Sequence, residues 1–292
     1  MNVKVDLCMW TKNGVETLTK VLTRIDEVIP KENVCHKILV DDHSVDGTVK
    51  IAKEFNWQIY PNPKTGISSG ANEALRHVDA AYFISFEQDL ILAKDWWLKI
   101  SPRLNNKKTV VASGMRFASK SQGVRKLQKY VAKKYRGEGK LSSWLRSREM
   151  SAFTLGKTLD NTIYRTCVMR ELGGFPVMSV NAGVDTVLAY KINDAGYGWH
   201  VDYKVQSVHL RRGLKDELQH QYWYGTQFYE ICRKIRNTTS VQPPISKFTV
   251  ISRFLISPFT GVFIALKTNE PSVAIIHPLI RYSYMRGLLD SR

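Results

Sequence analysis

The sequence of 292 residues predicts an α/β fold, with a mostly parallel central sheet flanked by helices and a C-terminal helical extension. Three observations predict it. The first hundred residues alternate short apolar runs with segments of helical periodicity, at the spacing of βαβ units. Two of the apolar runs stop at acidic residues, as expected where strands end at a binding cleft. The composition then shifts after residue 213 toward aromatic and basic helical segments.

The elements of the first hundred residues follow from this alternation. Apolar runs predict strands at residues 3–10, 36–42, 57–62 and 81–86, and 3.6-residue periodicity predicts helices at 15–28, 46–55 and 69–78. Because parallel strands end at the same edge of a sheet, the acids after the second and fourth strands are expected to line one cleft.

The next hundred residues show a looser pattern. We expect strands at 109–117, 161–164 and 199–210, and helices at 124–135 and 184–196. This predicts one α/β domain over residues 1–212, with a first half at about 1–100 and a second half at about 101–212.

The remaining residues, 213–292, are expected to form a helical, membrane-associating extension. Two helices are predicted around residues 217–236. Arg253 and Pro258 interrupt the most apolar stretch, 248–266. A helix that spans a bilayer needs about 20 predominantly apolar residues, and the uninterrupted part of this stretch is too short. Either it packs as a C-terminal helix or it lies in a membrane interface. The second hypothesis is favoured by nearby basic residues, which are Arg253, Lys267, Arg281 and Arg286.

The composition limits the possible functions. Apolar residues make up 43% and charged residues 24%, which is typical of a folded chain. The net charge of +17 favours an anionic partner: nucleic acid, anionic lipid or a phosphorylated substrate. Residues 120–148 alone hold ten Lys or Arg and one acid, yet no nucleic-acid-binding motif accompanies them. Four scattered cysteines without a CxxC pair, and a first segment without a signal peptide, predict a cytoplasmic protein.

Two loops are candidates for ligand binding. "ILVDDHSVDGT" is an apolar strand that ends at Asp41 and Asp42. These acids either cap the following helix or accept hydrogen bonds from a nucleobase or ribose. "NPKTGISSGAN" enters a helix through Gly66 and Gly70, which allow a ligand to approach the backbone closely, although no P-loop or dinucleotide pattern is present.

Three further segments carry candidate chemistry. In "FEQD", Glu87 and Asp89 follow a fully apolar strand, and carboxylates in such a position suit Mg²⁺ or Mn²⁺; the alternative is a solvated loop. Asp185 begins a helix and is either a cap or a catalytic acid or base. His209 ends a strand and is either structural or a ligand.

In order, these segments resemble the inverting family 2 glycosyltransferases, which have the GT-A fold. The resemblance covers residues 3–210. It depends on "VDLCMWTKNG", "VDDHSVDGT", "KTGISSGAN", "FEQD" at the DxD position, "RELGGF", "GVDTVLAYKINDAGY" and "VHL". It implies an enzyme that moves a hexose-type sugar from a UDP- or GDP-type donor to a hydroxyl or phosphate, with Mn²⁺ or Mg²⁺ as cofactor. It also implies that residues 1–212 are the catalytic domain, with a nucleotide-sugar half at about 1–100 and an acceptor half at about 101–212.

The resemblance also implies roles for individual residues. Asp185 is the expected general base, and Asp89 with His209 the expected metal ligands. The expected nucleotide-sugar-binding residues are Thr11, Asn13, Asp41, Asp42, Gly66, Asn72, Glu87, Gln88 and Arg211.

The chain departs from the family pattern at three positions. Glu87 replaces the first Asp of DxD, Val184 replaces the acid before Asp185, and Ala71 stands where an Arg is often found. These departures affect the expected donor sugar more than the reaction class.

The basic segment and the apolar C-terminus suggest a lipid-linked or glycan acceptor at the cytoplasmic face of a membrane, with an anionic surface as partner and no specific nucleic acid. There are two alternatives. One is a sugar-1-phosphate nucleotidyltransferase, which would need a Gly-rich loop with Arg and Pro after the first strand; the segment "TKNGVETLTK" is not such a loop. The other is a basic nucleic-acid-binding protein with a degenerate transferase-like domain.

Overall fold

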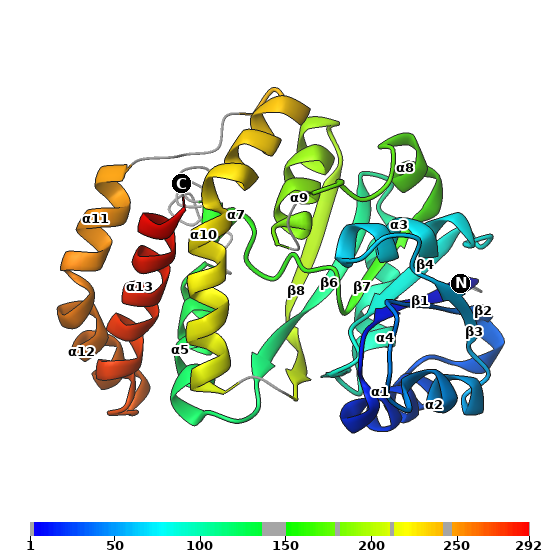
Figure 1. The fold of residues 1–292 in the computed structure, drawn as a ribbon, viewed down its shortest axis with the longest axis horizontal. Helices are drawn as coiled ribbons and strands as arrows, with labels where there is room; N and C mark the ends of the chain where they lie inside the picture. The colour runs from blue at the N-terminus through cyan, green and yellow to red at the C-terminus, as the bar shows by residue number, and fades with distance from the viewer. Residues whose placement is uncertain (1–2, 136–149, 179–181, 211–212, 242–246, 292) are drawn as a thin grey trace. The chain divides into compact units, whose positions relative to one another are not determined.

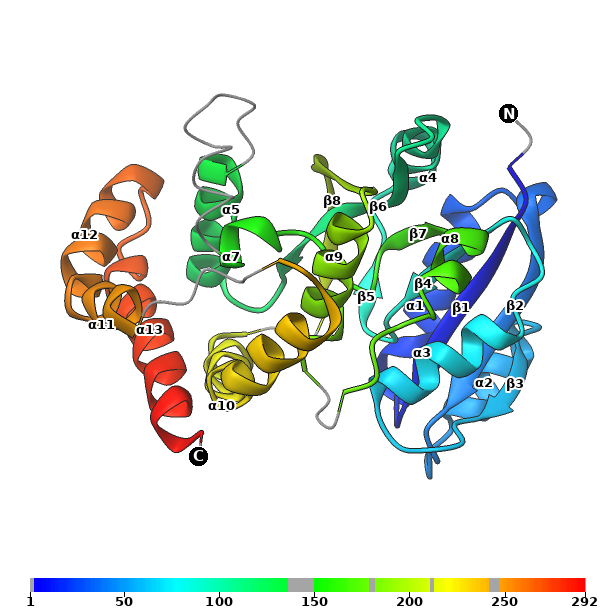
Figure 2. The same ribbon diagram turned by 90° about the horizontal axis from the view of Figure 1, so that it is seen from above.

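The computed structural model describes residues 3–135, 150–178, 182–210, 213–241 and 247–291. They form two compact units, which we call unit 1 (residues 1–116 and 156–210) and unit 2 (residues 117–155 and 211–292). Figure 1 shows the chain as a ribbon, and Figure 2 shows it turned by 90°. A single boundary at residue 212 was predicted, whereas in the structure the segment after residue 116 also groups with the C-terminal helices.

Unit 1 is built on a sheet that has eight strands within the described ranges, in the order β3-β2-β1-β4-β7-β6-β8-β5. The strands are β1 (Val5–Thr11), β2 (Val34–Asp41), β3 (Gln58–Pro61), β4 (Tyr82–Phe86), β5 (Leu90–Ile91), β6 (Thr109–Ala118), β7 (Thr162–Arg165) and β8 (Gly198–His209). The pairs β1–β2, β1–β4 and β2–β3 are parallel, as predicted for this part of the chain.

The rest of the sheet contains antiparallel pairs. β7 runs antiparallel to β4 and to β6, and β5 runs antiparallel to β8. The sheet is therefore mixed rather than mostly parallel throughout. A parallel neighbour needs a crossover of about a dozen residues or more, and the regular strand–helix alternation that supplies such crossovers stops after β4.

Helices cover both faces of the sheet because β1 is apolar on both of its sides. Leu7 and Met9 join a core cluster with Leu18 of α1 (Val15–Val28). Trp10 meets α3 (Ile67–Arg76), where a Cβ added to Gly70 would lie 2.8 Å from the Trp10 Cβ atom. The absence of a side chain at Gly70, which we expected to admit a ligand, is therefore needed for the packing of α3 on β1.

Helices α2 (Thr48–Glu54) and α9 (Val184–Asp194) begin and end close to their predicted positions. Unit 1 also contains α4 (Trp96–Ile100) and α8 (Thr166–Glu171), with 3₁₀ turns at Lys31–Asn33 and Ser101–Asn105.

Unit 2 is helical apart from the end of β6. Its helices are α5 (Gln122–Tyr135), α7 (Met150–Phe153), α10 (Leu214–Thr238), α11 (Lys247–Leu255), α12 (Ser257–Thr268) and α13 (Val273–Asp290). Buried residues of α5, α12 and α13, among them Val124, Ile264 and Ile276, form its core. Among the described helices, none has both the length and the apolar character needed to cross a membrane.

Two predictions about unit 2 were wrong. The predicted pair of helices around residues 217–236 is the single helix α10, since no proline interrupts the helical pattern there. The stretch 248–266 is instead two helices, α11 and α12, with Ile256 between them. Pro258 lies in the first turn of α12, where its missing N–H is tolerated; inside a continuous helix it would remove a hydrogen bond.

Helices α10 and α13 cross at two glycines. A Cβ on Gly287 of α13 would lie 2.0 Å from the backbone oxygen of Tyr222, and a Cβ on Gly225 of α10 would lie 2.3 Å from that of Tyr284. Backbone atoms cannot move aside as the end of a flexible side chain can, so the crossing requires both glycines.

We therefore predict that Gly287→Ala destabilises the protein by at least about 2 kcal/mol, because an overpacked contact forces the helices apart. Differential scanning calorimetry measures this. Gly213→Ala is the matched control, since its Cβ would meet only side-chain atoms at 3.5 Å and should change the melting temperature little. Equal melting temperatures for Gly287→Ala and the wild type would show that the crossing is not close packed.

Candidate functional site

The register of the sheet brings separated polar residues to the carboxyl end of β4. Glu87 follows β4 directly, and Ser85 of β4 pairs with Thr162, so Asp160, just before β7, reaches the same end. Leu90 of β5 pairs with His209, the last residue of β8, and the backbone N–H of Leu210 donates to the Asp89 carbonyl at 2.8 Å. Antiparallel pairing thus places the start of one strand beside the end of another.

Glu87, Asp89 and His209 form a candidate metal site, so the structure adds Glu87, which was predicted to bind the donor, to the predicted ligands Asp89 and His209. Each offers one ligand atom, and these atoms lie within 4.8 Å of one another. His209 Nε2 is 3.4 Å from Glu87 Oε2 and 3.5 Å from Asp89 Oδ1. In an octahedral site with bonds of about 2.1 Å, ligand atoms are about 3 to 4 Å apart. Two carboxylates and an imidazole at these separations fit a small divalent cation such as Mn²⁺ or Mg²⁺.

Arg116 neutralises the acids beside this site, a role that was not predicted from the sequence. Its Nη1 is 2.8 Å from Asp160 Oδ2 and 3.2 Å from Glu87 Oε2. Asp160 is fully buried, so its charge needs such a partner. The signal was present in the sequence: Arg116 is the one charged residue of β6, and a charge inside an apolar strand requires a buried partner.

Asp185, the predicted base, lies in the first turn of α9 and is half-buried. Its Oδ1 accepts a hydrogen bond from the backbone N–H of Thr186 at 2.7 Å. Burial raises the pKa of the Asp185 carboxyl above its ordinary value. The charge of Arg116 and the Thr186 N–H act in the opposite direction, and the nearby charges of Asp160 and Glu87 raise the pKa further. Asp185 therefore belongs to the same electrostatic cluster as Glu87, Asp160 and Arg116.

The two acids of "VDD" have different surroundings. Asp42 Oδ1 accepts from Asn62 Nδ2 at 3.2 Å, and Asp42 Oδ2 from the Gly66 N–H at 3.4 Å, with Lys12 Nζ at 3.6 Å. Asp41 Oδ2 accepts from the Ser44 N–H at 3.0 Å, but its Oδ1 is buried and has no hydrogen-bond partner among the described residues. Asp41 is thus the one of the pair with an acceptor to offer to a ligand.

Several of the other predicted donor-binding residues shape the loops around Asp41. The Gln88 amide accepts from the Lys12 N–H at 2.9 Å and donates to the Lys12 carbonyl at 3.0 Å, and its Oε1 also contacts the Thr11 hydroxyl. Asn13 has a positive φ of 49°, and its N–H donates to Ser44 Oγ at 2.9 Å. These contacts connect the loop after β1 to the loops after β2 and β4.

Two further predicted residues also have structural partners. Gly66 precedes α3 with a φ of 100°, a backbone conformation that favours glycine. The Asn72 amide donates to the Ser68 and Phe175 carbonyls, both at 2.9 Å, and accepts from the Phe175 N–H at 2.9 Å. Asn72 thus positions the "GGF" segment that ends at Phe175. Arg211 lies outside the described residues.

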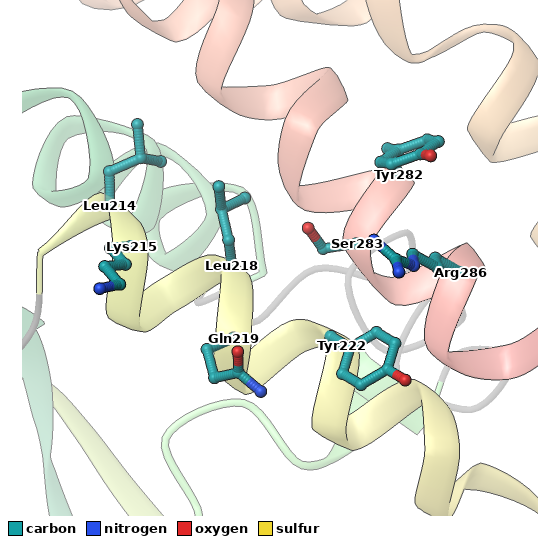
Figure 3. Close-up of a pocket in the computed structure, with 8 residues that line it drawn as sticks. All are labelled: Leu214, Lys215, Leu218, Gln219, Tyr222, Tyr282, Ser283 and Arg286. Carbon is teal, nitrogen blue, oxygen red and sulfur yellow. The ribbon is translucent and has the colours of Figure 1, made fainter. Parts of the chain in front are cut away.

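Unit 2 contains a separate cavity of about 760 Å³ between α10 and α13, shown in Figure 3. Leu214, Lys215, Leu218, Gln219 and Tyr222 line it from α10, and Tyr282, Ser283 and Arg286 from α13. The lining thus combines aliphatic and aromatic side chains with two cations and contains no carboxylate.

Both the sequence and the fold resemble known proteins. The sequence pattern of the family described as glycosyl transferase family 2 matches residues 6–170, which is more than half of the chain. No curated protein sequence matches significantly.

Three solved structures resemble the fold. The mannosyltransferase PcManGT from Pyrobaculum calidifontis, in complex with GDP-Man and Mn²⁺, has 16% identity and a TM-score of 0.65, covering 99% of this chain and 88% of that one. S. aureus TarS 1–349 has 14% identity and a TM-score of 0.60, covering 99% and 89%. Glucosyl-3-phosphoglycerate synthase from Mycobacterium tuberculosis, with Mn²⁺ and UDP, has 12% identity and a TM-score of 0.56, covering 82% and 81%.

The raised pKa of Asp185 gives a prediction about stability and pH. Below its ordinary pKa the Asp185 carboxyl is protonated in both the folded and the unfolded state, so it does not lower the free energy of unfolding. As pH rises through the higher folded-state pKa, the ionised carboxylate increasingly disfavours the folded state. Asp185→Asn should therefore melt at a higher temperature than the wild type at pH 8, and the difference should shrink toward pH 4.

Scanning fluorimetry across this pH range measures the effect. Asp95→Asn, which removes a carboxylate that is 43% exposed on unit 1, controls for the change in net charge. A difference for Asp185→Asn that did not vary with pH would mean that the burial of Asp185 does not disfavour its ionised form.

Proposed function

Because the chain belongs to glycosyl transferase family 2, we propose that it transfers a hexose-type sugar from a nucleoside diphosphate to an acceptor hydroxyl or phosphate, with inversion at the anomeric carbon. One observation carries the proposal: the set of Glu87, Asp89 and His209 lies at the same sheet edge as Asp41. Thr11 connects them, since it pairs with Asp41 in the sheet and its hydroxyl contacts Gln88. One nucleoside diphosphate would therefore bind with its diphosphate beside these three residues and with its nucleobase beside Asp41.

The donor is proposed to be of the UDP or GDP type. Asp41 Oδ1 is a buried acceptor without a partner in the described part of the chain, and leaving it so costs free energy that a ligand N–H would recover. Uracil and guanine both present a ring N–H. Support comes also from the structural neighbours, whose complexes contain GDP-Man, UDP-GlcNAc and UDP-Glc.

Glu87, Asp89 and His209 would hold Mn²⁺ or Mg²⁺, the ions present in complexes of the structural neighbours. When bound, such an ion offsets the negative charge that develops on the departing diphosphate. Arg116 keeps Glu87 in place by pairing with it, and so fixes one of the three ligands.

Asp185 is proposed as the general base that removes the proton from the acceptor hydroxyl as the hydroxyl attacks the anomeric carbon. Its position in the first turn of α9 places the carboxylate near the positive end of the helix dipole. The raised pKa makes the ionised form a stronger base than an exposed aspartate, which suits proton abstraction. A single base opposite the leaving group is sufficient for inversion.

The acceptor is proposed to be lipid-linked or a glycan, at the cytoplasmic face of a membrane. The cavity between α10 and α13 supports a lipid-linked acceptor, because aliphatic and aromatic side chains line it together with the cations Lys215 and Arg286. All four cysteines are free, which is consistent with a reducing compartment. A role in glycan biosynthesis follows from this acceptor class.

The nucleotidyltransferase alternative is not supported. The glycosyl transferase family 2 match covers residues 6–170, which include the loop after β1 where a nucleotidyltransferase would need its Gly-rich sequence. The nucleic-acid-binding alternative differs from the proposed function in requiring no donor and no metal ion, so a donor-binding experiment separates the two.

We predict that UDP- or GDP-sugars with Mn²⁺ raise the melting temperature of the wild type, because a ligand that binds only the folded state stabilises it. Asp89→Asn and addition of EDTA should each remove most of this shift and the sugar transfer. A thermal-shift screen followed by a transfer assay measures both, with Asp95→Asn as the control. Undiminished transfer in EDTA would contradict the metal role.

Asp41→Asn should weaken nucleotide binding roughly 10- to 100-fold, which corresponds to one hydrogen bond to a charged acceptor. It should leave the melting temperature of the free protein nearly unchanged. Asp42→Asn is the comparison: it should lower the melting temperature, since Asn62, Gly66 and Lys12 all contact the Asp42 carboxylate. Isothermal titration with UDP and GDP measures the affinities, and equal affinities for wild type and Asp41→Asn would exclude Asp41 from the base site.

A further inference from the structure

One face of α11 and α12 in unit 2 is apolar and open to solvent. Its side chains are Leu255, Ile256, Phe259, Val262, Phe263 and Leu266. Phe259 is 80% exposed and Leu266 79% exposed. From Phe259 to Leu266 the spacing of i, i+3, i+4 and i+7 places four of them on one side of α12. We call these six residues the apolar face.

The opposite side of α12 already packs within unit 2. Ile264 and Ala265 are buried there in the cluster with Val124 and Ile276. The core of unit 2 therefore does not need the apolar face. Two exposed phenylalanines and four exposed aliphatic residues side by side are more than isolated surface hydrophobics.

The positive charge of the chain is concentrated in the same unit. The sequence of unit 2 contains 22 Lys and Arg against seven acids, while unit 1 contains 21 against 19. Unit 2 thus carries fifteen of the seventeen net positive charges. Lys267 directly follows Leu266, and its Nζ lies 5.7 Å from the Phe263 ring centroid, so a cation borders the apolar face.

From this combination we propose that unit 2 binds the surface of an anionic lipid bilayer through the apolar face, which enters the interface without spanning it. An amphipathic segment of this kind lies about 5 to 10 Å deep at the boundary between headgroups and acyl chains. Lys267 can extend its ammonium group to the headgroups while its methylene groups stay beside Phe263. The excess positive charge of unit 2 attracts anionic headgroups over about a Debye length.

The same features disfavour the other occupants. A nucleic acid is bound by cations and stacking surfaces and gains little from Leu, Ile and Val side chains. A second copy would bring two units of net charge +15 together, and their repulsion opposes association. A bilayer with anionic lipids buries the apolar face and also attracts the positive charge of unit 2.

The experiment is co-sedimentation of the full-length protein with sucrose-loaded vesicles of phosphatidylcholine alone or with 30% phosphatidylglycerol. We expect binding at least tenfold stronger to the anionic vesicles. Leu266→Ser and Phe259→Ser should each weaken that binding at least fivefold. The matched control is Leu98→Ser, which removes a leucine of 76% exposure from α4 of unit 1 and should bind like the wild type.

Three outcomes would overturn the proposal. The first is equal vesicle binding by Leu98→Ser and Leu266→Ser, and the second is salt-sensitive binding to duplex DNA or RNA that is as strong as binding to vesicles. The third is a wild-type dimer that Leu266→Ser converts to a monomer while vesicle binding is unchanged. Analytical ultracentrifugation detects the last, and melting temperatures confirm that each variant is folded.

The link between this surface and a lipid-linked acceptor rests on the proposed function, but vesicle binding needs neither donor nor metal. Donor-induced thermal shifts measured on the same variants distinguish the two. Shifts retained by Leu266→Ser without vesicle binding support the apolar face as a membrane contact, and vesicle binding by a wild type that no donor stabilises would contradict only the proposed function.

Discussion

The ion pairs of Arg116 with Asp160 and Glu87 are the interaction on which the catalytic end of unit 1 depends. Four carboxylates, those of Glu87, Asp89, Asp160 and Asp185, lie in one electrostatic cluster, and burial strengthens their repulsion. Arg116 brings a guanidinium into the cluster from β6, with two carboxylates within 3.2 Å of its Nη1. This requires β6 beside β7 and β7 beside β4, so the antiparallel half of the sheet is a condition for the site.

A second constraint acts on the nucleotide side of the site. The motifs there are rich in polar groups, and most of these groups bond to one another. Gln88 binds the Lys12 backbone and Asn72 binds the Phe175 backbone, so their amides shape loops. Two buried oxygens there, Asp41 Oδ1 and Asn62 Oδ1, have no hydrogen-bond partner within the described ranges. Most polar groups of these motifs therefore position the loops, and few are left to bind a ligand.

Unit 2 differs from unit 1 in its physical character. Nearly all of the net charge of the chain belongs to it, and its helices pack by close backbone contact at Gly225 and Gly287. The proposed division of labour follows: unit 1, which is nearly neutral, holds the chemistry, and unit 2 contacts an anionic surface. Because the two properties lie in different residues, each can be changed without the other.

The sequence by itself determined the strand–helix alternation of the first hundred residues and the apolar strand that leads to Glu87 and Asp89. These are local patterns, since the period of apolar residues and the residues at strand ends are properties of short segments. Only the tertiary structure decided which acid of "VDD" keeps a free acceptor, that Gly70 serves packing, and that Arg116 joins Glu87 to Asp160. Those outcomes depend on contacts between residues up to 60 positions apart, which no short segment of the sequence contains.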